Sequence, residues 1–160
     1  MVLGMDFYSY AAVALVALAG LPVGIFLSLF AFEELKSGNR YFSLLSKILF
    51  VAVSSVPIVA GEYPAALRGV SYGAIILAAL LVSDSRVSYV FLSLAFSLSS
   101  KTNYFALTAS LVFLYGLSSG ALIAGTSGHI SLKNNLLRVM AQETVKSSGL
   151  LIAFLLYFML

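Results

Sequence analysis

Cysteine and tryptophan are absent from the 160-residue sequence, and histidine occurs only once. The lack of cysteine excludes disulfide bonds, thiolate metal sites and cysteine nucleophiles. Charged side chains are also scarce, at 9% of the chain, whereas an average soluble domain has ~25%. This scarcity excludes a water-soluble globular domain and a disordered segment. One histidine and six carboxylates leave few ligands for a metal or a haem, so we expect no cofactor.

Apolar side chains dominate what is present. They make up 61% of the residues, and the mean hydropathy is +1.06. The charges occur in short clusters between long uncharged runs, which is typical of a polytopic membrane protein. The net charge of +3 is spread over predicted loops without forming a basic patch, so we expect no nucleic-acid partner.

We predict an all-α integral membrane protein, a compact bundle of six transmembrane helices that forms a single domain over residues 1–160. A helix needs about 20 apolar residues to cross the hydrocarbon core of a bilayer. The charged stretch 33–40 is predicted to be the first loop. The uncharged run 87–100 is short for a full crossing, so five spans plus a re-entrant or short helix are the alternative. The six spans are predicted at residues 7–32, 42–60, 65–83, 87–100, 104–125 and from about 139 to 160.

The placement of Lys and Arg predicts the orientation of this bundle. With six spans, seven basic residues fall on one side, against Arg68 and Lys101 on the other. Because the positively charged side of a membrane protein faces the cytoplasm, we expect a multi-pass protein of the cell membrane with both termini outside. The seven residues are Lys36, Arg40, Lys47, Arg86, Lys133, Arg138 and Lys146.

Three predicted spans each carry two glycines separated by three residues. This spacing puts both glycines on one helix face and lets another backbone approach closely, where lipid supplies no hydrophobic drive. The motif predicts helix packing, either within the chain or between copies of it. The glycines are Gly20 and Gly24, Gly69 and Gly73, and Gly116 and Gly120.

Two short motifs resemble those of membrane proteases. Residues 125–128 are similar to the Gly-x-Ser-Gly nucleophile motif of rhomboid proteases, and Glu33-Glu34 followed by Arg40 resembles the paired-glutamate motif of the CAAX-type protease family. Both families need histidines from other helices, whereas the single His129 directly follows the first motif. The arginine also lies two residues farther from the glutamates than in the second family. The sequence therefore contains no complete catalytic set, which favours a role other than catalysis.

Ionisable residues within membrane spans are candidate functional groups because their burial in lipid is costly. Glu143 and Lys146 would be neighbours on one helix face. The segment 132–146 is either an amphipathic helix at the membrane surface or the start of the last span. We expect Glu143 to be enclosed by protein and paired with Lys146 or Arg40.

The leading functional hypothesis is a small transporter-type or channel-type protein, or a subunit of a larger membrane complex. The alternative is a membrane-embedded hydrolase or protease that acts on a lipid or peptide at the cytoplasmic face, with Glu33 or Glu34 as base and His129 assisting. A structural scaffold is the third hypothesis. Expected partners are membrane lipids and either other membrane subunits or a second copy. The candidate polar cluster consists of Glu33, Glu34, Arg40, Asp84, Arg86, Glu143 and Lys146.

Overall fold

The computed structural model of the chain describes residues 7–28, 30, 32–61, 64–81, 85–100, 102–127 and 138–145. Every regular element in this part of the chain is a helix, which confirms the predicted all-α class. The helices are α1 (Phe7–Ser28), α2 (Phe32–Ala60), α3 (Ala65–Leu81), α4 (Ser85–Ser99), α5 (Phe105–Ser127) and a short helix over 138–145.

Three of these helices are long and apolar enough to cross a membrane. The qualifying stretches are Tyr8–Ser28 in α1, Ser37–Ala60 in α2 and Phe105–Gly125 in α5. Shorter apolar stretches, Leu67–Ala79 and Val87–Ser99, lie in α3 and α4. The fold is therefore compatible with a membrane protein that has at least three spanning helices.

The prediction of a loop at residues 33–40 is wrong. These residues form the first turns of α2, and the connection from α1 is a short turn in which the Phe30 amide donates to the Leu27 carbonyl at 3.1 Å. Glu, Leu, Lys and Arg are all good helix formers, so a change from apolar to charged residues marks the end of an apolar span without ending the helix. Helix α5 likewise continues past residue 125, the predicted end of the fifth span, as far as Ser127.

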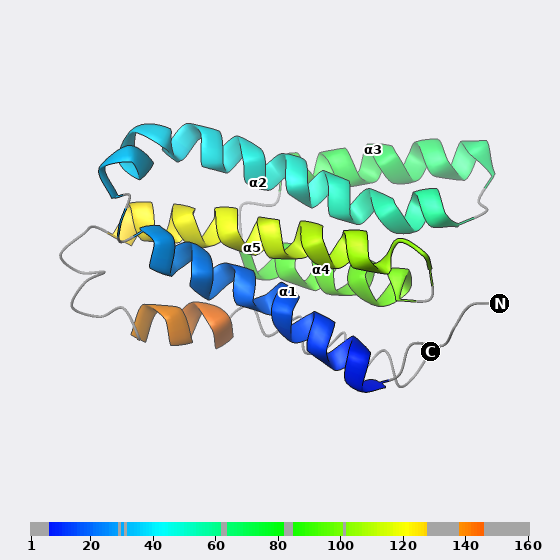
Figure 1. The fold of residues 1–160 in the computed structure, drawn as a ribbon. Helices are drawn as coiled ribbons and strands as arrows, with labels where there is room; N and C mark the ends of the chain where they lie inside the picture. Colours follow the sequence, from blue (N-terminus) through cyan, green and yellow to red (C-terminus); the bar gives the residue numbers. More distant parts are fainter. Residues whose placement is uncertain are drawn as a thin grey trace.

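Helix α5 lies at the centre of the bundle and packs against α1, α2 and α4, whereas α3 packs mainly against α2 (Figure 1). Successive helices run in opposite directions, so α1 and α5 are parallel (Figure 1). This parallel arrangement brings together two of the glycine motifs.

Aromatic rings fill the interior where α1 and α5 begin and α4 ends. Tyr10, Phe96 and Phe105 are all nearly inaccessible to solvent, and their ring centroids lie 4.9–5.6 Å apart. Such ring pairs contribute about 0.5–1.5 kcal/mol each beyond the area they bury. They tie α4 to the α1–α5 pair at this end of the bundle.

Candidate functional site

Helices α1 and α5 approach each other so closely that two positions of α1 at the contact have no room for a side chain. Gly20 and Gly24 are both buried. A Cβ atom at Gly20 would overlap the backbone carbonyl of Phe113, and one at Gly24 would overlap that of Leu117. The two glycines are thus required by the proximity of the facing backbone.

The glycines of α5 mirror this arrangement. A Cβ atom at Gly116 would lie 2.8 Å from the backbone nitrogen of Leu21, and one at Gly120 would lie 2.9 Å from that of Ile25. Real Cβ atoms essentially never make contacts this short. Four of the six glycines singled out in the sequence therefore form one parallel, backbone-to-backbone helix contact.

The third glycine pair has no such neighbour. Gly69 and Gly73 on α3 are exposed, and a Cβ atom at either would meet nothing within 4 Å in the described part of the chain. Large apolar side chains beside them are also exposed, including Val70 at 72% and Leu77 at 58%. The same sequence motif thus forms a closed contact in one region and an open apolar face in another.

Buried hydroxyl groups link α2 and α4 to α5. Ser46 Oγ lies 2.9 Å from Ser118 Oγ, and the Tyr89 hydroxyl lies 2.9 Å from Ser119 Oγ. Both α5 serines also donate to a carbonyl one turn earlier at 3.0 Å, which uses the single proton of each. Ser46 and Tyr89 are therefore the donors across the helices, and these four hydroxyls satisfy one another inside the bundle.

The sequence did not identify Ser46 and Tyr89 as partners of Ser118 and Ser119. Nothing in the local sequence distinguishes Ser46 from the other serines of the chain. Only the tertiary arrangement of α2, α4 and α5 selects the partners.

The helix over residues 138–145 packs against the bundle beside this hydroxyl cluster. Val139 and Met140 contact the apolar core, while Arg138 and Val145 are exposed. Glu143 is half-buried and within electrostatic range of Tyr89. The segment thus turns one face, including Glu143, toward protein.

The remaining charged candidates are distributed over two helices and the undescribed segments. Glu33 and Glu34 belong to the first turn of α2, and Arg86 to the first turn of α4; their side chains are not among those described. Arg40 is exposed and makes no ion pair in the described part of the chain, so it does not pair with Glu143. Asp84, His129 and Lys146 lie outside the described residues.

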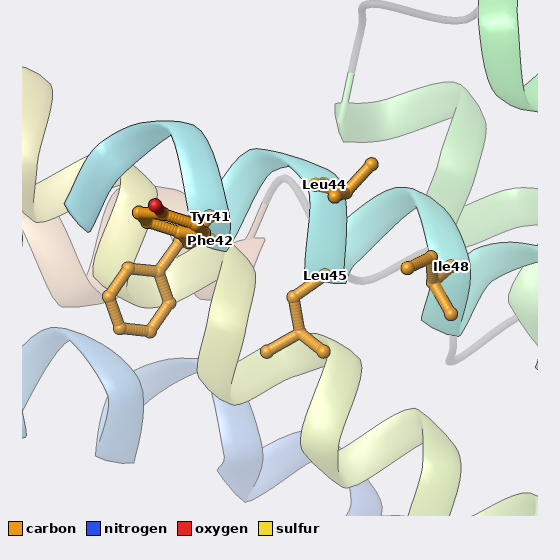
Figure 2. Close-up of a pocket in the computed structure, with 5 residues that line it drawn as sticks. All are labelled: Tyr41, Phe42, Leu44, Leu45 and Ile48. Atoms are coloured by element: carbon orange, nitrogen blue, oxygen red, sulfur yellow. The ribbon is translucent and has the colours of Figure 1, made fainter.

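An apolar pocket of about 390 Å³ is lined by five residues of α2 (Figure 2). Figure 2 shows Phe42 and Leu45 directed toward the neighbouring helices and Leu44 directed away from them. Among the described residues, no group of three or more His, Cys, Asp or Glu side chains could hold a metal ion. The pocket is lined by Tyr41, Phe42, Leu44, Leu45 and Ile48.

Comparison of the chain with protein-family models, with curated proteins and with solved structures gave no match.

Proposed function

We propose that the protein is an integral membrane subunit that assembles with a second copy of itself through the exposed face of α3. One observation supports this proposal above all others. The glycine motifs of α1 and α5 pack against each other, whereas Gly69 and Gly73 of α3 meet no neighbour within 4 Å among the described residues.

The choice of a second copy rests on geometry. Two copies inserted in one membrane have the same orientation, so a two-fold axis along the membrane normal makes their α3 helices parallel. Parallel packing of two such motifs is the arrangement that α1 and α5 already adopt in this chain (Figure 1). A second α3 would therefore present a complementary face without any further adaptation.

The interior of the bundle supports a structural role. The hydroxyl groups of Ser46, Tyr89, Ser118 and Ser119 are paired with one another and with backbone carbonyls. In membrane proteins such pairs contribute to helix association, on average about 0.6 kcal/mol each. We propose that this interior holds α2 and α4 against α5 while α3 is left available for assembly.

Assembly through α3 is tested by crosslinking in native membranes, and the absence of cysteine gives a clean background. If two α3 helices pack at their glycines, the Cα atoms of the two Gly69→Cys residues should lie within the 4.4–6.8 Å that a disulfide requires. Mild oxidation should yield a covalent dimer. The matched control is Val16→Cys on α1, at a position with 63% exposure, and should remain monomeric. Equal crosslinking of both variants, or of neither, would contradict the proposal.

We further propose six spans with both termini outside. The alternation of helix direction in Figure 1 and the bias of Lys and Arg support this topology. A membrane-impermeant thiol reagent applied from outside should label Glu62→Cys and spare Ser37→Cys. The opposite labelling pattern would reverse the orientation, and labelling of both would contradict the number of spans.

A further inference from the structure

We propose that the N-terminal half of α2 binds an anionic phospholipid, with an acyl chain in the apolar pocket of Figure 2 and the phosphate between Arg40 and Lys47. This site lies on a different helix from the assembly face of α3. The two proposals can therefore fail independently.

The pocket matches an acyl chain. Five side chains line it, and the only polar atom among them is the hydroxyl of Tyr41. Tyr41, Leu44 and Ile48 are 77%, 58% and 56% exposed, so in a bilayer the pocket opens directly to lipid. A hydrocarbon chain fills such a surface without leaving polar groups unsatisfied.

Two cations are adjacent in sequence to residues that line the pocket, Arg40 beside Tyr41 and Lys47 beside Ile48. Arg40 and Lys47 are separated by seven residues, which is close to two helical turns, so they share one face of α2. Leu44 lies between them on that face and lines the pocket. Both cations are exposed, and neither makes an ion pair in the described part of the chain.

Lys47 lies inside the candidate membrane span of α2, where a counterion is favourable. The apolar span of α2 begins at Ser37, so Lys47 lies about ten residues, or ~15 Å, along its axis. A lipid-exposed charge at such a depth is costly unless it reaches the interface or finds a partner. Helical side chains tilt toward the N-terminus of their helix, which directs the Lys47 stem toward Arg40.

A phosphodiester at the level of Arg40 can accept charge-assisted hydrogen bonds from both cations. The exposed Tyr41 hydroxyl lies one residue beyond Arg40 and offers a third donor. Two positive charges without acidic neighbours among the described side chains favour a headgroup with net negative charge over a zwitterionic one. The adjoining acyl pocket favours a phospholipid over free phosphate.

The proposal is tested on delipidated protein in a neutral detergent, with three probes. These are dioleoyl phosphatidylglycerol, dioleoyl phosphatidylcholine and inorganic phosphate, each titrated while the melting temperature and the lipid occupancy by native mass spectrometry are recorded. Phosphatidylglycerol should bind about tenfold more tightly than phosphatidylcholine, and inorganic phosphate should neither raise the melting temperature nor displace the lipid.

The informative variant is the double change Arg40→Gln and Lys47→Gln, which should abolish this preference. Its matched control, Arg68→Gln and Arg138→Gln, removes the same charge from two other exposed positions and should retain the preference. If the double variant at α2 does not fold, Lys47→Gln alone should lower the preference and Lys47→Arg should restore it.

Three results would overturn the proposal. Equal losses of the preference for phosphatidylglycerol in the two double variants would mean a general attraction of a basic protein to anionic lipid. Competition by inorganic phosphate would mean a simple anion site. A wild-type protein without preference for phosphatidylglycerol would mean that no headgroup site exists on α2.

Discussion

The contact between α1 and α5 and the outer face of α3 carry the same glycine motif in opposite surroundings. In the first region each added Cβ atom would collide with the facing backbone, and in the second it would meet nothing within 4 Å in the described part of the chain. The comparison teaches that the motif permits a close helix contact without specifying one. Whether the contact forms depends on a partner helix of suitable direction.

Glycine in an exposed helix is unfavourable by about 0.5–1 kcal/mol relative to alanine. Gly20 and its three partners offset this cost by allowing two backbones to pack together. Gly69 and Gly73 receive no such compensation from the residues that the structure describes, although they too lie in a helix. Association of two α3 helices would supply the missing compensation, which is the energetic argument for self-assembly.

The largest difference between the two regions is expected for leucine substitutions. Gly120→Leu drives a side chain into the backbone of α1, and backbone atoms cannot move aside as a flexible side chain can. Overpacking usually costs about 1–3 kcal/mol, and we expect a loss at or above the upper end of that range. Gly73→Leu should leave the folding stability of the monomer nearly unchanged but prevent dimer formation. Thermal denaturation and light scattering in mild detergent measure the two effects.

A substantial loss of monomer stability in Gly73→Leu would show that α3 has an intramolecular neighbour on this face. Retention of dimers in the same variant would move the assembly interface to another surface. Either result would contradict the proposed difference between the α1–α5 contact and the outer face of α3.

Alanine substitutions should change stability in opposite directions. Gly69→Ala removes backbone freedom from an open helix position and should stabilise the dissociated chain by about 0.5–1 kcal/mol. Gly20→Ala makes the same chemical change where the new methyl group would overlap the carbonyl of Phe113, and should be destabilising. The comparison is made by denaturant unfolding of both variants in one detergent. The same sign for both would contradict the structural contrast.

Some of this contrast could be predicted from the sequence. The composition and the uncharged runs predicted an all-helical chain with apolar spans, and the glycine spacing identified the faces able to pack closely. The sequence did not show that the pair on α3 has no neighbour among the described helices, because that depends on helix order and direction in the folded bundle. Local spacing is the same in all three motifs.

The charged residues show a second limit of sequence reasoning. Glu33, Glu34 and Arg40 mark where the apolar span begins, and the interpretation of these residues as a loop was wrong because they also favour helix. These residues were expected to form a polar cluster with Arg86 and Glu143. Such a cluster depends on how the helices pack, which the spacing of residues in the sequence does not specify. Arg40 is instead exposed on α2, next in sequence to Tyr41 of the apolar pocket.

A smaller effect on stability is expected when a tyrosine hydroxyl is removed from the bundle interior rather than from α3. Tyr89→Phe removes the hydroxyl that donates to Ser119 inside the bundle and should cost about 0.6 kcal/mol, the average for such bonds in membrane proteins. Tyr72→Phe on α3 is the matched control. Tyr72 is half-buried and has no hydrogen bond or ion pair in the described chain, so its variant should be neutral. Equal stability changes in the two variants, measured by thermal unfolding, would argue against a structural role for the hydroxyl cluster.

The smallest effect is expected for Glu143→Gln, which tests whether helix 138–145 belongs to the closed core. Glu143 is half-buried near Tyr89, so its charge is partly solvated and its neutralisation should cost less than about 1 kcal/mol. Because the two residues interact, Glu143→Gln and Tyr89→Phe should be non-additive, whereas Glu143→Gln and Tyr72→Phe, on different parts of the fold, should be additive. A double-mutant cycle of unfolding free energies measures both. A loss of ~3–5 kcal/mol for Glu143→Gln alone would instead reveal a buried ion pair, with Glu143 at the centre of a functional charge cluster.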